Sequence, residues 1–230
     1  ISCSLVGSEM CIRDSCGCGR IAAGSTNELM PVAKIVILNW NGAEHLRRFL
    51  PSVVAAAPAG VEVIVADNGS TDDSLAVLAA GFPSVTVLRM DRNYGFAGGY
   101  NRALEHIEAD YYLLLNSDVE TPEGWLAPIL DCLDRNPDVA VVSPKLISCL
   151  ERTKFEYAGA SGGFIDFLGY PFCRGRILRC VEKDRGQYDD GRDVFWVSGA
   201  AFCCRADVFR ALGGFDGDFF AHMEEIDLCW

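Results

Sequence analysis

The sequence lacks a long apolar run, a block of basic residues and a paired-cysteine framework, and each absence excludes a class of protein. No stretch reaches the roughly 20 apolar residues of a membrane-spanning helix, which predicts a soluble chain. Acidic residues outnumber basic ones by 32 to 20 without any Lys/Arg run, so nucleic acid is not an expected partner. The cysteines beyond residue 30 are single or adjacent (Cys203–Cys204), which predicts free thiols and a cytoplasmic location.

Residues 1–29 differ in composition from the rest of the chain. Four of the eleven cysteines gather there, without the basic start and apolar centre of a secretory signal. The spacing of Cys11, Cys16 and Cys18 does not form two C-x-x-C arms of a zinc site. We therefore predict a non-native or disordered leader, with Met30 as the start of a single domain over residues 30–230.

From Lys34 onward, short β-branched runs alternate with helix-like segments, which is typical of an α/β fold with a mostly parallel sheet flanked by helices. Strands are predicted at Ile35–Leu38, Val61–Ala66, Val85–Leu88, Tyr111–Leu115 and Val139–Val142. Helices are predicted at Ala43–Ala57 with a break at Pro51, from Asp72 with Ser70 or Thr71 as its cap, at Ala97–Ile107, at Ala206–Leu212 and at Ala221–Trp230. Residues 145–193 have little periodicity, which indicates extended strands and a long loop over the site.

Polar residues follow the first two predicted strands, at the position where open α/β sheets bind ligands. Asn39 and Asn41 follow the first strand, and Asp67 and Asn68 follow the second. A carboxylate held at a strand end has only acceptors, so Asp67 is suited to the ring N–H of a pyrimidine base. The run Asp-Asn-Gly-Ser also favours an Asx-turn, which taken alone explains Asp67 at least as well.

A glycine-rich segment, Asn93–Arg102, follows the third strand. Glycines at a helix start let the backbone approach a ligand, and free amides there favour phosphate. The spacing is G-x-x-G-G and not the G-x-G-x-x-G of dinucleotide sites, so a mononucleotide is indicated and NAD is not. Tight helix packing would explain these glycines about equally well.

The fourth strand ends in Asn116-Ser117-Asp118, which puts an amide and a carboxylate at the centre of the sheet. Mg2+ or Mn2+ bound by one or two carboxylates and by substrate phosphates is the usual arrangement for nucleoside diphosphates. The alternative is a capped turn leading into Thr121–Pro122, where the proline begins a helix.

An acidic cluster lies near the end of the chain, at Glu224, Glu225 and Asp227. Three carboxylates within four helical residues repel one another and resist burial unless a cation or a substrate offsets the cost. Glu224 and Asp227 share a helix face, whereas Glu225 points elsewhere. The alternative is a solvated acidic face, against which the apolar flanks Phe219–Phe220 and Leu228–Trp230 argue.

Together these motifs resemble those of the family 2 glycosyltransferases, which are inverting enzymes of the GT-A type, and in particular the rhamnosyltransferase-like members, over Val32 to Trp230. The resemblance implies that Asn116-Ser117-Asp118 replaces an Asp-x-Asp metal motif and that Glu224–Glu225 stands where the family has Glu-Asp. Asp118 would then ligate Mg2+ or Mn2+, and Glu225 would be the base, with Glu224 and Asp227 left open. Residues implied to bind the donor are Asn39, Asn41, Asp67, Asn68, Asn93, Gly98, Asn101, Asn116 and Ser117, and those on the acceptor side are Trp196 and Gly199.

The implied activity is metal-assisted transfer of a sugar from a UDP- or dTDP-linked donor to a glycan or lipid-linked acceptor, in cell-wall or polysaccharide biosynthesis. The acceptor hydroxyl would lose its proton to Glu225 and attack the anomeric carbon in one displacement, with inversion. Residues 30–143 would form the donor half, and residues 144–230 an acceptor and base half that is incomplete at its C-terminus, with peripheral association at the inner face of a membrane. Two alternatives stay open, a nucleotidyltransferase and a fragment that binds the donor without turnover. A nucleotidyltransferase should carry a Gly-rich loop with Arg or Lys after the first strand, and Asn39–Glu44 does not provide one.

Overall fold

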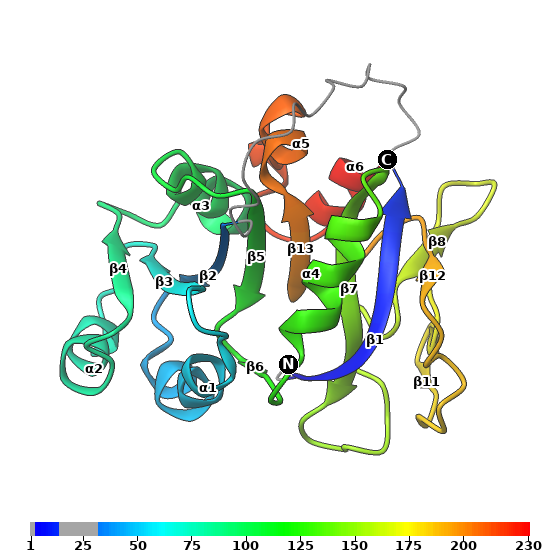
Figure 1. The fold of residues 1–230 in the computed structure, drawn as a ribbon, viewed down its shortest axis with the longest axis horizontal. Helices are drawn as coiled ribbons and strands as arrows, with labels where there is room; N and C mark the ends of the chain where they lie inside the picture. Colours follow the sequence, from blue (N-terminus) through cyan, green and yellow to red (C-terminus); the bar gives the residue numbers. More distant parts are fainter. Residues whose placement is uncertain (1–2, 14–31) are drawn as a thin grey trace.

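A nine-stranded sheet runs through the computed structural model, which describes residues 3–13 and 32–230 (Figure 1). Along the sheet lie β12 (Arg192–Asp193), β1 (Cys3–Arg13), β7 (Val139–Ser148), β13 (Ala201–Arg205), β5 (Tyr111–Asn116), β2 (Ala33–Asn39), β3 (Glu62–Asp67) and β4 (Thr86–Arg89), and β6 (Val119–Glu120) pairs with β1 beside this path. The strands β5, β2, β3 and β4 are parallel, and β13 is antiparallel between β5 and β7. The predicted α/β class with a mostly parallel central sheet is confirmed.

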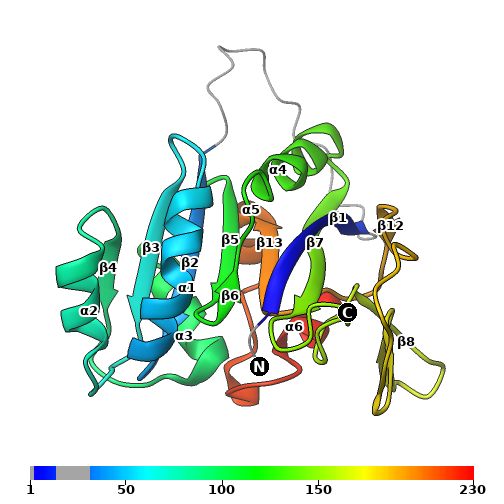
Figure 2. The ribbon, with the colours of Figure 1, turned by 90° about the horizontal axis from the view of Figure 1, so that it is seen from below.

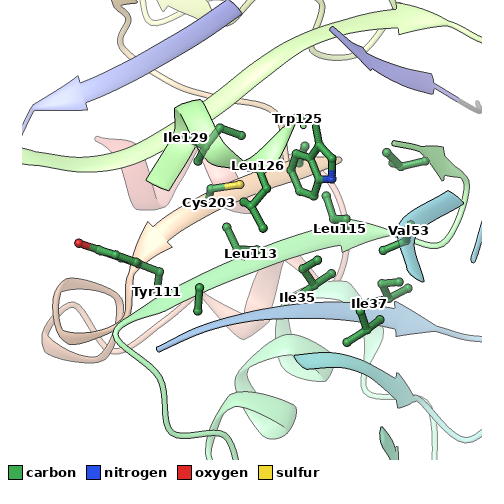
Figure 3. Close-up of a cluster of buried hydrophobic side chains, with 14 of the residues drawn as sticks. Ile35, Ile37, Val53, Tyr111, Leu113, Leu115, Trp125, Leu126, Ile129 and Cys203 are labelled. Atoms are coloured by element: carbon green, nitrogen blue, oxygen red, sulfur yellow. The ribbon is translucent and has the colours of Figure 1, made fainter. Parts of the chain in front are cut away.

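Helices cover both faces of the sheet, because alternate residues of each strand point to opposite sides and almost all of them are apolar. The helices are α1 (Ala43–Ala56), α2 (Ser74–Gly81), α3 (Gly95–Leu104), α4 (Leu126–Arg135), α5 (Ala206–Ala211), the short 3-10 helix η1 (Gly217–Phe219) and α6 (Glu224–Cys229). On one face α1, α2 and α4 pack on Ile35, Leu113 and their neighbours, in the cluster that Figure 3 shows. On the other face α3 and α5 pack on Val36 and Tyr112. None of the helices in the described ranges has the length and apolarity needed to cross a membrane.

The break predicted at Pro51 is wrong, because α1 continues through this proline to Ala56. A proline inside a helix removes one N–H and leaves the carbonyl four residues earlier, that of Arg47, without its partner. Both Pro51 and Arg47 are exposed, so water can hydrate that carbonyl. The buried residues of the same helix, Leu46, Leu50 and Val53, keep α1 on the sheet on both sides of the proline.

A second sheet of four short strands lies in the segment between β7 and β12. It contains β8 (Gly163–Ile165), β9 (Pro171–Cys173), β10 (Arg176–Ile177) and β11 (Cys180–Val181) in the order β11-β10-β9-β8. Lys145 of β7 is 1% exposed and pairs with Asp184 at 2.7 Å and with Asp189. This buried lysine therefore ties the loop after the small sheet to the main sheet.

The N-terminal strand β1 lies antiparallel to β7, with Cys3 opposite Ser148. That residues 1–29 are a non-native or disordered leader stays a prediction. Cys16, Cys18 and Met30 lie outside the described residues.

Arg205→Ala is expected to lower the free energy of unfolding by about 2 kcal/mol, because the carbonyls at the end of α4 lose their donors. The Arg205 guanidinium donates to the carbonyls of Val139 at 2.7 Å and Asn136 at 3.0 Å, and also to that of Leu133. Urea unfolding of the variant and of the parent measures the difference. Arg135→Ala is the control: it breaks an exposed pair with Asp131 and should cost no more than about 0.5 kcal/mol. Equal losses in the two variants would contradict the capping role.

Candidate active site

The carboxyl ends of β2, β3 and β5 meet at one rim of the main sheet. Strand pairing places Asn39 opposite Asp67 and Leu38 opposite Asn116. In Figure 2 the arrowheads of β3 and β5 point toward the same lower edge. Three segments that are far apart in the sequence therefore present their polar ends side by side, where open α/β sheets bind ligands.

Asp67 is held at this rim by hydrogen bonds to both of its carboxylate oxygens. The buried Asn39 donates from Nδ2 to Asp67 Oδ1 at 3.2 Å, and the Ser70 amide donates to Asp67 Oδ2 at 3.2 Å. The second contact closes a turn within Asp67–Ser70, although it reaches the third residue on and not the second, as an Asx-turn would. Contact of Asp67 with a base stays a prediction, and its side chain is 2% exposed.

Asn41 joins the loop after β2 to the loop after β3. Its backbone N–H donates to Ser70 Oγ at 2.9 Å, and its side-chain Oδ1 accepts from the Thr71 backbone N–H at 2.8 Å. Asp72 caps two helices, because its carboxylate accepts from the amides of Ala43 at 3.0 Å and Ser74 at 2.9 Å. The predicted capping of the second helix by Ser70 or Thr71 is therefore wrong, since the Ser70 hydroxyl accepts from the loop after β2.

Asn68 fastens the glycine-rich segment to the rim. Its Nδ2 donates to Asn93 Oδ1 at 3.0 Å and to the Gly95 carbonyl at 2.8 Å. A Cβ on Gly99 would lie 2.8 Å from Asn68 Nδ2, so helix packing against β2 and β3 accounts for this glycine. A Cβ on Gly98 would meet only Tyr94 Cβ, at 3.4 Å.

The first backbone amides of α3 are capped by the segment that leads into α6. The Phe220 carbonyl accepts from the amides of Phe96 at 2.6 Å and Ala97 at 3.3 Å. The expectation of free amides at this helix start is therefore wrong, because a backbone carbonyl more than 100 residues away already caps them. Asn101 of the same helix bonds the Phe215 backbone from both ends of its side-chain amide, at 2.7 and 3.0 Å. The donor roles predicted for Asn68, Asn93, Gly98 and Asn101 stay predictions.

The turn after β5 carries Asn116, Ser117 and Asp118. The backbone N–H of Asn116 donates to the Ala200 carbonyl at 3.1 Å, which joins this turn to the segment before β13. Asp118 is 8% exposed. Within residues 3–13 and 32–230, no group of three or more His, Cys, Asp and Glu side chains could hold a metal ion. A divalent ion here would take one carboxylate from the chain and its other oxygens from a diphosphate, and ligation by Asp118 stays a prediction.

The acidic residues of α6 lie in three different environments. Glu224 is 3% exposed, and its Oε2 has no hydrogen-bond partner among the described residues. Burial first, and then the charge of Glu224, raise the pKa of Glu225 to about 7. Burial also raises the pKa of Glu224, whereas Asp227 is exposed. The alternative of a solvated acidic face therefore describes Asp227 and not the buried Glu224 or the partly buried Glu225.

Of the two residues expected on the acceptor side, Gly199 lies at the rim and Trp196 lies in a core. A Cβ built on Gly199 would stand 3.9 Å from Glu224 Oε1. Trp196 is 2% exposed, packs against Gly163 and donates from Nε1 to the Phe164 carbonyl at 3.1 Å. The acceptor roles of both residues stay predictions.

Contacts thus link most of the rim. They run from Asp67 through Asn39 to the paired ends of β2 and β5, and then from Asn116 to Ala200. Gly199, next to Ala200, lies close to Glu224, because a Cβ built on it would stand 3.9 Å from Glu224 Oε1. Ser70, Asp72 and the Phe220 carbonyl belong to this arrangement, although no sequence pattern indicated their partners.

A sequence model described as "Glycosyl transferase family 2" matches residues 34–203. The N-acetylglucosaminyl-diphospho-decaprenol L-rhamnosyltransferase of Mycobacterium tuberculosis is 28% identical over 213 residues, which cover 86% of this chain and 69% of that protein. The pre-mycofactocin glycosyltransferase of the same organism is 30% identical over 205 residues, which cover 85% of this chain and 38% of that protein.

Two solved structures share the fold. A mannosyltransferase from Pyrobaculum calidifontis, in complex with GDP-Man and Mn2+, superposes with a TM-score of 0.54 at 16% identity and covers 87% of this chain and 51% of its own. GalNAc-T7 with UDP, GalNAc and Mn2+ superposes with a TM-score of 0.59 at 15% identity and covers 89% of this chain and 41% of its own. The fold is therefore that of the GT-A glycosyltransferases, and this chain spans about half the length of these structures.

Glu225→Gln is expected to raise the melting temperature by several degrees near pH 8 and to leave it unchanged near pH 4. The folded-state pKa of about 7 lies above the ordinary value of 4.5, so the native state binds the proton more tightly and stability falls as pH rises between these values. Above that pH window, replacing the ionised carboxyl group raises the free energy of unfolding by about 1–3 kcal/mol. Thermal melts across the window test this, with the exposed Asp227→Asn as control. A shift of Glu225→Gln that does not depend on pH would contradict the assignment.

Proposed function

The chain belongs to the glycosyl transferase family 2, and from that premise we propose that it transfers a sugar from a nucleoside diphosphate sugar to a hydroxyl group of an acceptor. The observation that carries the proposal is the set of contacts and close approaches that gathers Asp67, Asn116 and Glu224 at one rim. Asp118 follows Asn116 by two residues and Glu225 is next to Glu224, so a hydrogen-bond acceptor for a nucleobase, a carboxylate for a cation and a general base for a hydroxyl proton come from these neighbouring segments. The titration and the kinetics below test the donor half and the base half separately.

The donor and acceptor classes are supported by the relatives. Solved structures of the same fold contain UDP or GDP-Man with Mn2+. The rhamnosyltransferase of Mycobacterium tuberculosis is named for a diphospho-decaprenol acceptor, which is lipid-linked. We propose a UDP- or dTDP-linked donor and a glycan or lipid-linked acceptor in cell-wall or polysaccharide synthesis, at the cytoplasmic face of a membrane.

On the donor side, Asp67 accepts a hydrogen bond from the ring N–H of the base. Asn39 and the Ser70 backbone amide hold the two carboxylate oxygens of Asp67 in place, so this hydrogen-bond acceptor is oriented before the nucleotide sugar binds. Asn41 and Asn68 keep the loops on either side of Asp67 in position through their own bonds to Thr71 and Tyr94.

Asp118, with Asn116 beside it in the same turn, would hold Mg2+ or Mn2+ together with the donor diphosphate. When bound, the cation neutralises the charge that develops on the leaving diphosphate. An amide in place of a second carboxylate leaves the chain with less negative charge here, so we expect the cation to bind weakly until the diphosphate supplies oxygens.

On the acceptor side, Glu225 takes the proton of the attacking hydroxyl group. A pKa of about 7 suits this step, because the carboxylate is formed near neutral pH and still has a useful affinity for a proton. Glu224 contributes by keeping that pKa high. The hydroxyl oxygen forms its bond to the anomeric carbon as the bond to the diphosphate breaks, so the configuration inverts and no glycosyl-enzyme bond forms.

Asp118→Ala is expected to weaken UDP binding about tenfold or more in the presence of Mn2+ and to leave metal-free UDP binding nearly unchanged. Isothermal titration of the 230-residue protein with UDP, with and without Mn2+, measures both. Asp131→Ala, which removes an exposed carboxylate of α4, is the matched control and should bind like the parent. An absence of UDP binding, or equal binding by Asp118→Ala and parent, would refute the donor site.

Glu225→Gln is expected to lower kcat by about 100-fold or more with little change in donor binding, because only the proton acceptor is lost. Glu225→Asp, which restores the shorter acid of the family motif, should retain more activity than Glu225→Gln. Glu224→Gln should move the acid limb of the rate profile to lower pH, because the Glu224 charge raises the pKa of Glu225. Donor turnover at saturating acceptor, measured across pH 5–9, tests all three.

Full activity of Glu225→Gln beside an inactive Glu224→Gln would reverse the two roles. Donor binding without turnover in the parent would show a binding domain.

A further inference from the structure

Exposed apolar side chains gather at two turns of the four-stranded sheet. Phe167 and Leu168, in the turn between β8 and β9, are 94% and 66% exposed. Ile177 and Leu178, at the turn between β10 and β11, are 64% and 81% exposed. Large apolar groups held in water in this way mark a surface that another phase or molecule covers.

The two turns leave the same end of the small sheet. Its neighbours β8 and β9, β9 and β10, and β10 and β11 are all antiparallel, so the turns after β8 and after β10 lie at one end. In Figure 2 the strands around β8 and the arrowheads of β3 and β5 extend toward the same lower edge of the view. The small sheet and the rim that carries the candidate active site thus share one side of the molecule in this view.

Both turns are formed structures and do not owe their exposure to frayed backbone. Asp166 Oδ1 accepts from the amides of Leu168 at 2.8 Å and Tyr170 at 2.9 Å, and the rings of Phe164 and Phe172 pack 5.8 Å apart behind the first turn. At the second turn Arg176 donates to the Leu178 carbonyl at 3.0 Å. The apolar tips are thus presented on a scaffold that fixes their direction.

Basic side chains lie at the second of these turns. Arg176 and Arg179 are both there, in a protein whose net charge is −12, and Asp166 is the acidic residue at the base of the first turn. Arg174 lies in the turn at the opposite end of the small sheet and pairs with Asp190 at 3.0 Å, whereas Arg179 is exposed. Apolar tips with neighbouring arginines complement an anionic lipid surface, where the side chains enter the acyl boundary and the guanidinium groups meet phosphates.

We propose that the turns at Phe167–Leu168 and Ile177–Leu178 insert into the interfacial layer of an anionic bilayer. The rim on the same side of the molecule would then face the lipid surface, with Tyr170 and Phe172, 68% and 42% exposed, at the depth of the headgroups. A second protein copy is a poorer occupant, because a stable interface buries about 800 Å² on each partner and two narrow tips offer little flat area. Binding to lipid needs no transferase activity, and only its consequence, access to a lipid-linked acceptor, rests on the proposed function.

Cosedimentation of the 230-residue protein with vesicles tests the proposal without donor or metal. We expect binding to vesicles of phosphatidylglycerol and phosphatidylcholine in equal parts, and much weaker binding to phosphatidylcholine alone. Phe167→Ser with Leu168→Ser, and Ile177→Ser with Leu178→Ser, should each lower the partition coefficient about tenfold or more. Arg179→Glu should lower it severalfold on anionic vesicles only. The control is Leu212→Ser, which changes a side chain of similar exposure, 61%, outside the small sheet and should bind like the parent.

A second measurement uses the intact turn. Phe167→Trp should show a blue shift of its added emission and quenching by brominated lipid when anionic vesicles are present. Failure of the parent to bind anionic vesicles, unchanged binding by both double variants, or an unshifted Phe167→Trp spectrum would overturn the proposal. So would a dimer in light scattering that both double variants dissociate while vesicle binding stays unchanged. UDP titration of the same samples keeps the two proposals apart: vesicle binding without UDP binding would refute the donor site and leave the lipid surface standing.

Discussion

The parallel pairing of β2 with β3 and β5 is the constraint on which the rest of the site depends. It aligns Asn39 with Asp67 and Leu38 with Asn116, so residues 28 and 77 positions beyond Asn39 meet at one edge. Burial of these apolar strands on both faces keeps them in the sheet, and their register decides which polar residues meet at its edge. The polar network at the rim therefore depends on the strands of the hydrophobic core.

A second constraint comes from the C-terminal part of the chain, which closes on the first half. The Phe220 carbonyl caps the start of α3, and Asn101 binds the Phe215 backbone. These contacts hold the segment before α6 and so help to place Glu224 against Gly199. The cost is visible in the backbone, since Phe220, His222 and Met223 all have positive φ. Two adjacent carboxyl groups with raised pKa values and this backbone strain occur together, a combination that is common at functional sites.

The small sheet adds a different physical property to the same edge. Ion pairs from Lys145 and Arg174 hold the loop that follows it, while its turns present apolar side chains together with Arg176 and Arg179. Within one acidic chain, the rim is polar, whereas the turns of the small sheet are apolar with basic neighbours. The proposed transfer to a lipid-linked acceptor would bring these two environments together.

The sequence by itself determined the α/β class, the five predicted strands and the motifs at their ends, because burial on both faces leaves a continuous apolar run and a polar residue where each run stops. It could not determine what these polar residues contact. Ser70 as a partner of Asn39, Asp72 as the cap of α1, and the Phe220 carbonyl at the start of α3 involve residues about 30 to 120 positions apart. Local patterns also misplaced a helix break at Pro51, since only packing reveals that its lost hydrogen bond faces water. The different environments of Glu224, Glu225 and Asp227 were decided by tertiary structure alone, because burial depends on what the rest of the chain packs around each carboxyl group.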